Sequence, residues 1–238
     1  MKLLLQRTLN PHWDGPFRVE EARWEGHRLS GFLSLRKGSQ SDFEPRYDGQ
    51  GRICYLSDWP EPVSLYRSPH ELIERGPVFK AAFDALGQRA TLVSHDEGPW
   101  GLSLDGREPE FFPSSLTHVV AIAHQGWCVS SLDRLYEGRP GQWQDRGPIE
   151  YRRFTCGTEG QLFYCLNRQL FGHTPGRVLW HEVDEGFLSF PLWTPRGLLV
   201  SQDDPQRLWW VTSPGQAEIL WQGGDERLYV CDWASLSS

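Results

Sequence analysis

The stretch that decides the fold runs from residue 160 to residue 226. It reads GQLFY at 160–164, RQLF at 168–171, TPG at 174–176, VLW at 178–180 and DE at 184–185. A near copy follows, with GLLV at 197–200, QRLW at 206–209, SPG at 213–215, ILW at 219–221 and DE at 225–226. Short apolar runs that alternate with turn residues are typical of a meander of about four antiparallel strands. The chain is therefore predicted to repeat one small β unit.

Weaker copies of this unit precede the clear pair. Gly51 opens one that leads to Leu65, and Gly126 opens another that leads to Leu135. A large apolar anchor stands shortly before each opening glycine. The anchors are Tyr47, Phe83, Ile122, Phe154 and Trp193, separated by 36, 39, 32 and 39 residues. Four-stranded units at this period suit propeller blades, in which the anchor fills space between blades and glycine makes the turn after the innermost strand.

The C-terminal residues indicate how such a ring closes. Residues 228–233 repeat the spacing of 188–193, 149–154 and 78–83, so Trp233 ends the first strand of a sixth unit. Its other three strands are expected at the N-terminus, within residues 3–9, 17–24 and 28–35. The prediction is an all-β fold, with residues 1–238 forming a single domain. This domain is a six-bladed β-propeller closed by the C-terminal strand, which joins the N-terminal blade.

Two features leave alternatives open. The spacing from Ser68 to Glu71 is that of a capping box and would start a helical turn. Residues 87–116 match the repeat poorly. A five-bladed propeller and a β-sandwich are therefore the alternative folds.

The repeat resembles that of β-propellers in general, and among them the short six-bladed sort similar to TolB-like propellers. The resemblance lies in spacing and covers most of the chain. The sequence has no WD dipeptide pattern, no kelch double glycine and no S-x-D-x-G-x-T-W box. Because one fold hosts many activities, the resemblance implies an architecture and no family function.

Charge and composition restrict the classes of function. A net charge of -7 repels a nucleic-acid backbone. The first apolar run, at residues 3–5, is too short for a signal peptide, and no run is long enough to span a membrane. The five cysteines are odd in number and lack CxxC spacing, as in a reducing cytosol. We expect a cytoplasmic protein that binds neither nucleic acid nor membranes.

Acidic residues recur before the anchors, where turns leading into the innermost strands are expected. They are Glu74, Asp145 and Asp184, each nine residues before an anchor, Asp225, eight before Trp233, and Asp42, five before Tyr47. On one face of a propeller, these carboxylates would attract a basic protein surface or a hard cation such as Ca²⁺. The alternative is ordinary turn capping, which the pair Asp203-Asp204 also suggests.

Most tryptophans fall at repeat positions, where packing between blades is expected. Trp13, Trp59 and Trp143 lie instead in segments rich in turn residues and are candidates for exposed aromatic contacts.

The sequence contains no G-x-S-x-G motif, no phosphate-binding loop and no HExxH, so no catalytic residue is assigned. The leading hypothesis is a non-enzymatic protein-binding module, namely an immunity or inhibitor protein that binds a basic toxin or effector. It would act as a monomer without a cofactor, in a bacterium, since Arg greatly outnumbers Lys. The alternatives are a divalent-cation-dependent hydrolase or lactonase with Ca²⁺ at the central channel, and a sugar-binding lectin.

Overall fold

The computed structural model shows antiparallel β-strands joined by turns. It describes residues 3–8, 17–24, 29–36, 46–47, 53–57, 64–68, 71–84, 86–94, 98–122, 126–149, 154–157, 161–173, 176–194, 197–223 and 227–235. Within these ranges the chain is all-β and forms no helix, so none of them supplies a helix that could cross a membrane. Strands occupy the segment for which a helical turn was the alternative, because its apolar residues pack into a sheet core.

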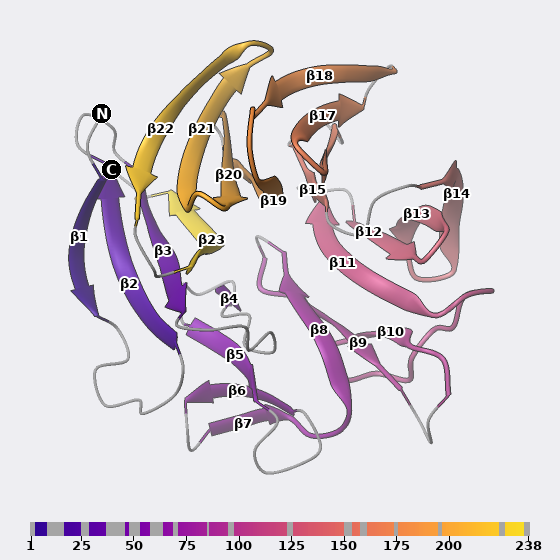
Figure 1. The fold of residues 1–238 in the computed structure, drawn as a ribbon. Coiled ribbons are helices and arrows are strands. Elements are labelled where there is room, and N and C mark those ends of the chain that lie inside the picture. Colours follow the sequence, from indigo (N-terminus) through magenta and orange to yellow (C-terminus); the bar gives the residue numbers. More distant parts are fainter. Residues whose placement is uncertain are drawn as a thin grey trace. The chain divides into compact units, whose positions relative to one another are not determined.

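The strands, which are labelled in Figure 1, fall into two compact units by their contacts. The central unit comprises Asp42–Arg152 and Thr158–Gly160. It holds three sheets, with strand orders β4-β5-β6-β7, β10-β9-β8 and β11-β12-β13-β14. The strands are β4 (Arg46–Tyr47), β5 (Ile53–Ser57), β6 (Ser64–Ser68), β7 (Glu71–Glu74), β8 (Val78–Phe83), β9 (Arg89–Val93), β10 (Gly101–Leu104), β11 (Leu116–Ile122), β12 (Gly126–Ser131), β13 (Arg134–Arg139) and β14 (Gln142–Pro148).

The terminal unit comprises Met1–Ser41, Arg153–Gly157 and Gln161–Ser238. Its three sheets have the orders β15-β16-β17-β18, β19-β20-β21-β22 and β1-β2-β3-β23. The strands are β1 (Leu3–Thr8), β2 (Phe17–Trp24), β3 (Leu29–Arg36), β15 (Phe154–Cys156), β16 (Leu162–Leu166), β17 (Gln169–His173), β18 (Arg177–Glu182), β19 (Phe187–Thr194), β20 (Gly197–Asp203), β21 (Arg207–Ser213), β22 (Gln216–Gln222) and β23 (Arg227–Ser235).

Within each unit the sheets are arranged like neighbouring blades of a β-propeller. Four of them are four-stranded meanders of consecutive strands, as the repeat predicts. One edge strand of each sheet contacts an edge strand of the next. In the central unit β8 contacts both β4 and β11, and in the terminal unit β19 contacts both β15 and β23. These edge strands correspond to the innermost strands of the predicted blades.

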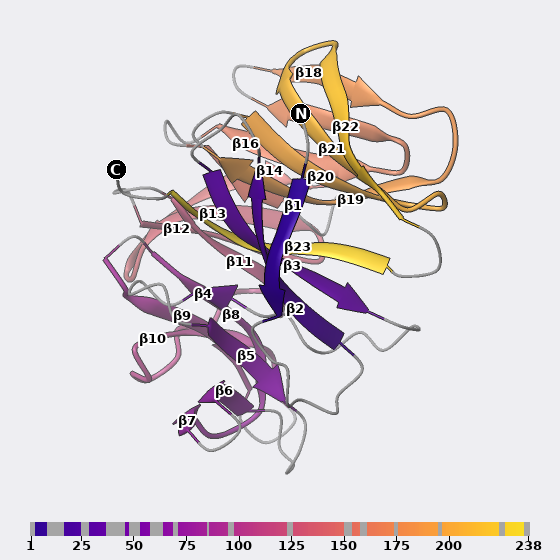
Figure 2. The same ribbon diagram turned by 90° about the vertical axis from the view of Figure 1, so that its left-hand side faces the viewer.

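The sheet at the chain ends has the composition predicted from sequence. β23 lies beside β3 (Figure 2) and pairs with it antiparallel. In this pairing Trp233 lies opposite Gly31. Strands β1 and β2 complete the sheet. The pairing shows that the C-terminal segment supplies the missing strand of the N-terminal group.

One irregularity recurs in all four consecutive meanders. The third strand carries a buried leucine followed by an aromatic residue, and the outer strand has one extra residue opposite this step. The leucines are Leu65, Leu135, Leu170 and Leu208, and the extra residues are Ile73, Arg146, Trp180 and Leu220. A bulge increases the twist of a strand and makes an edge a poor template for pairing. The Leu-aromatic pairs that mark the repeat in the sequence therefore also mark a shared backbone feature.

The anchors and opening glycines behave as predicted at the positions with the clearest contacts. The ring of Trp193 on β19 stacks on Phe163 of the neighbouring sheet, with centroids 5.2 Å apart and planes 7° apart. Gly126 opens β12 at a φ of 123°, and a Cβ there would collide with the carbonyl oxygen of Gly138. The anchor Trp193 thus fills space between sheets, and Gly126 permits the close approach of β13 to the start of β12.

The sheet β8–β10 is the least regular, in agreement with its weak repeat. It has three strands, and its fourth position is occupied by a single bridge at Glu110. Glu110 exchanges backbone hydrogen bonds of 2.8 and 2.9 Å with Leu102. Pro109 and Pro113 flank this bridge and lack the N–H groups that a longer ladder needs.

Candidate functional site

The structure places the predicted acids in unlike positions. Asp42 and Asp225 lie outside the described residues. Glu74 is the last residue of β7, Asp145 lies within β14, and Asp184 lies in the turn after β18. The expectation that all of them occupy turns is therefore wrong for Glu74 and Asp145. Equal spacing from the anchors did not place them equivalently because the outer strands end at different distances from those anchors.

Glu74 forms a mostly buried ion pair. Its Oε2 lies 3.0 Å from Nε of Arg89, and the two side chains are 13% and 16% exposed. The hydroxyl of Thr91 donates to both carboxylate oxygens, at 3.1 and 3.2 Å. Because Arg89 and Thr91 belong to β9, the carboxylate of Glu74 joins two sheets of the central unit. Its contacts are those of a structural residue.

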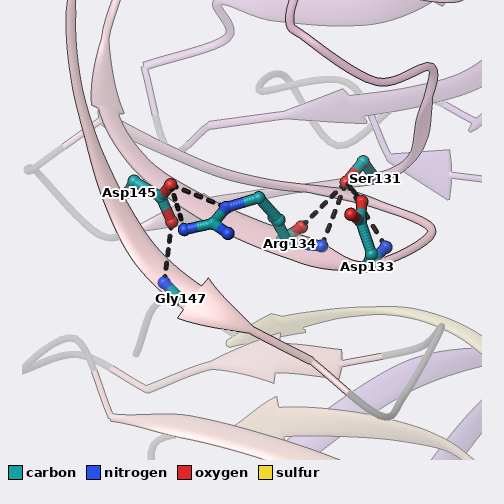
Figure 3. Close-up of polar contacts among 5 residues, drawn as sticks. All are labelled: Ser131, Asp133, Arg134, Asp145 and Gly147. Carbon is teal, nitrogen blue, oxygen red and sulfur yellow. Dashed lines mark hydrogen bonds and ion pairs between the residues drawn. The ribbon is translucent and has the colours of Figure 1, made fainter.

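Asp145 is neutralised by an arginine of its own hairpin (Figure 3). Arg134 donates from Nε to Oδ2 at 2.7 Å, and its Nη2 lies 2.6 Å from the same oxygen. The backbone N–H of Gly147 donates to Oδ1 at 2.8 Å. The hydrogen bond from Arg134, followed by that from Gly147, holds the pKa of Asp145 below its ordinary value. The carboxylate in turn raises the pKa of Arg134.

The turn before Arg134 fixes its backbone. Ser131 donates from its hydroxyl to Oδ1 of Asp133 at 2.8 Å and accepts the backbone N–H of Arg134 at 3.0 Å (Figure 3). Such local bonds favour a tight turn. The charges of this hairpin are therefore largely compensated within the hairpin itself.

Asp184 has different surroundings, because its carboxylate is exposed. Its carbonyl oxygen accepts a hydrogen bond from Nη1 of Arg168 at 2.8 Å. The N–H of Val183 donates to the carbonyl of Arg168 at 3.0 Å. These two bonds tie the turn after β18 to the turn between β16 and β17. They use backbone groups of this turn and leave the side chain of Asp184 at the surface.

The turn after β18 also lies against the turn between β20 and β21. Gly186 has a φ of 68°, and a Cβ there would collide with the carbonyl oxygens of Asp203 and Asp204. The buried amide of Gln202 donates to the carbonyl of Glu185 at 2.9 Å. Backbone contacts thus bring two carboxylate-rich turns together. We call Asp184, Glu185, Asp203 and Asp204 the acidic turn pair.

The acidic turn pair is only partly compensated by positive charge. The side chain of Glu185 is 61% exposed, and its nearest recorded cation, Nη1 of Arg207, lies 3.5 Å away. An apolar side chain stands beside it, since Phe187 is 57% exposed and pairs with Asp203 across β19 and β20. Exposed carboxylates beside an exposed ring can bind a surface that presents both cations and apolar groups.

Sequence reasoning singled out Asp184 and missed the residues gathered around it. The motif DEGF at 184–187 and the motif DDP at 203–205 were visible as turn signals. Their proximity depends on the pairing of β19 with β20, which brings residue 187 opposite residue 203. No spacing along the chain reports that pairing.

Trp143 is half-buried and packs against Phe112 within the central unit. Its ring meets Phe112 edge to face at 5.2 Å, and Phe112 meets Tyr136 at 5.0 Å. The other two candidate aromatic contacts, Trp13 and Trp59, lie outside the described residues. A contact role for these three tryptophans stays a prediction.

Among the residues that the structure describes, no three His, Cys, Asp or Glu side chains form a group that could hold a metal ion. Cys54, Cys128, Cys156 and Cys165 are free thiols, and burial raises the pKa of the Cys165 thiol. Because burial disfavours the thiolate at Cys165, this thiol serves packing.

No protein-family model, curated protein or solved structure matches this chain. Function is therefore inferred from its own side chains.

Proposed function

We propose that this protein is a non-enzymatic binding module that holds a basic partner protein through the acidic turn pair. The partner is a toxin or effector, and the module acts as its immunity or inhibitor protein in the bacterial cytoplasm. It works as a monomer and needs no cofactor.

The observation that carries the proposal is the acidic turn pair itself. Asp184, Glu185 and Asp204 lie on two turns in backbone contact, and Asp203 ends the strand beside them. Among the described residues, Arg207 pairs with Glu185 at 3.5 Å, and Arg168 binds the carbonyl oxygen of Asp184 rather than its carboxylate. The exposed ring of Phe187 adds an apolar contact at the same place. Complementary charge speeds encounter and fixes orientation, while a buried aromatic anchor supplies affinity. The net charge of -7 adds long-range attraction for a basic partner.

The architecture we propose for this module is a closed six-bladed propeller, TolB-like in general form. It would be a single domain in which the sheet of β1, β2, β3 and β23 seals the ring. Closure of this kind leaves few free sheet edges and provides a rigid scaffold for turns on one face.

The proposal is tested by affinity capture of the product of the neighbouring reading frame, followed by titration calorimetry. The double variant Asp184→Asn/Asp204→Asn keeps the size of both side chains, and Asn tolerates the φ of 52° at position 204. Loss of two carboxylates is expected to weaken binding roughly tenfold, about 1.4 kcal/mol, and to flatten its salt dependence.

The matched control is Glu108→Gln/Glu218→Gln, which also removes two exposed carboxylates, one in the loop after β10 and one on β22. This control is expected to leave affinity within about twofold, because isolated exposed charges contribute little. An equal loss in both double variants would show that only net charge matters. Absence of any stable protein complex would refute the binding role.

A further inference from the structure

His181 lies at the contact between two sheets of the terminal unit. It belongs to β18, and its ring centroid lies 4.4 Å from that of Trp209 on β21, with the planes tilted by 51°. Its Nε2 is buried, and no residue of the described part of the chain forms a hydrogen bond with it. A neutral imidazole can leave Nε2 without a hydrogen. An imidazolium would carry an N–H at Nε2, buried and without an acceptor.

We propose that His181 is a pH-sensitive contact whose protonation loosens the packing of sheet β15–β18 against sheet β19–β22. The contact holds best above neutral pH and weakens in mild acid.

Neighbouring charges offer the imidazolium little compensation. The titratable groups on the packed elements are Arg177 and Glu182 on β18, His173 on β17, Arg207 on β21, Glu218 on β22, and Asp184 and Glu185 in the following turn. Glu182 accepts a hydrogen bond from Gln169 at 2.8 Å, and Arg207 lies against Glu185. Among the described residues, none of these groups forms an ion pair with His181.

Two effects oppose each other at the ring contact. A protonated imidazole over an indole gains a cation–π attraction, while burial disfavours the charged form. Burial lowers the pKa of His181 below its ordinary value of 6.5, which favours the neutral ring in the folded state. The folded state therefore binds fewer protons than the unfolded chain. The contribution of neutral His181 to the stability of the folded state is fully present above pH 6.5 and declines as the pH falls below that value.

The contact continues from Trp209 to the acidic turn pair. Trp209 donates from Nε1 to Oε1 of Gln202 at 2.7 Å, and Gln202 donates to the carbonyl of Glu185 at 2.9 Å. Movement of Trp209 would remove one of the two bonds that hold the amide of Gln202. Acid would then loosen the contact between the two turns of the acidic turn pair. Its effect on partner binding rests on the function proposed above.

The test is thermal melting of the full chain between pH 7.5 and pH 5.0, with wild type and His181→Phe compared. Phenylalanine keeps an aromatic ring against Trp209 and cannot be protonated. The fall in Tm over this range is expected to be about 2–4 °C smaller in His181→Phe, which corresponds to a roughly fivefold difference in the folding equilibrium for a chain of this length. His173→Gln, at an exposed position of the same sheet, is expected to keep the wild-type fall.

A second measurement covers the case in which His181→Phe fails to fold. The imidazole proton signals of wild-type His181 are followed by NMR as the pH is lowered, and they are expected to titrate below pH 6.5. Titration at or above pH 6.5, or an unchanged pH profile in a folded His181→Phe, would overturn the proposal. Neither result depends on a partner, so failure here is distinguishable from failure of the binding function.

Discussion

Two acids that lie nine residues before an anchor have opposite surroundings in the structure. One, Asp145, belongs to the hairpin of β13 and β14, and the other, Asp184, to the turn after β18. Asp145 lies inside a strand, where Arg134 and Gly147 satisfy its carboxylate. Asp184 lies beyond its strand, where the recorded bond uses its carbonyl oxygen and leaves its side chain exposed. An equal distance from an anchor therefore does not imply an equivalent role. Local partners decide whether a carboxylate stabilises the fold or remains available to a ligand.

The largest effect is expected from a substitution that disrupts the contact between the turn after β18 and the turn between β20 and β21. Gly186→Ala would place a Cβ against two backbone carbonyls at a φ of 68°, so the free energy of unfolding should fall by about 2–4 kcal/mol. Urea denaturation measures the change. Gly141→Ala is the matched control in the turn between β13 and β14, where φ is 72° and nothing lies within 4 Å of the added atom.

The control is expected to lose about 1 kcal/mol, from backbone strain alone. Similar losses in both alanine variants would mean that the two acidic turns are not in contact. The acidic turn pair would then cease to be a single surface.

An intermediate effect is expected at Glu74, the most buried of the described acids in the predicted set. Glu74→Gln removes the charge that faces Arg89, whose side chain is 16% exposed, and should reduce the free energy of unfolding by about 1–3 kcal/mol. The exposed counterpart Asp184→Asn should change it by less than about 0.5 kcal/mol. Urea denaturation of both variants measures the two losses in the free energy of unfolding. Equal losses would refute the distinction between a structural carboxylate at Glu74 and an exposed one at Asp184.

The smallest expected effect is at the ion pair of Arg134 and Asp145, whose side chains are 43% and 40% exposed. Solvent screens such pairs, so Asp145→Asn should shift Tm at pH 7 by no more than the error of the experiment. The lowered pKa of Asp145 sets the sign of its pH dependence. Its contribution is present above the ordinary value of 3.8 and is lost as the pH falls through the lowered value.

NMR titration of the Asp145 carboxyl carbon checks this direction directly. In Arg134→Met its pKa should return towards 3.8, because the largest cause of its shift is removed. A pKa that stays low in this variant would show that Gly147, rather than Arg134, dominates.

The sequence predicted the small sheets well because their signals are local. Alternation, turn residues and the Leu-aromatic step of Leu170 and Leu208 recur within single units, and β17 and β21 carry them as expected. The sequence predicted the sheet β8–β10 less well, because Pro109 and Pro113 lie where the alternating pattern of a fourth strand would be expected. For the candidate site it identified Asp184 alone, since Glu185, Asp203 and Asp204 resemble ordinary turn residues.

What the sequence determined by itself is a repeating all-β chain whose final strand joins its first three. Each of these features follows from apolar periodicity and glycine placement, which act over a few residues. Only the tertiary structure decided which acids are neutralised and which remain exposed. That outcome depends on strand register and on contacts between sheets, such as Gly186 against Asp203, and these join residues whose separation along the chain carries no signal.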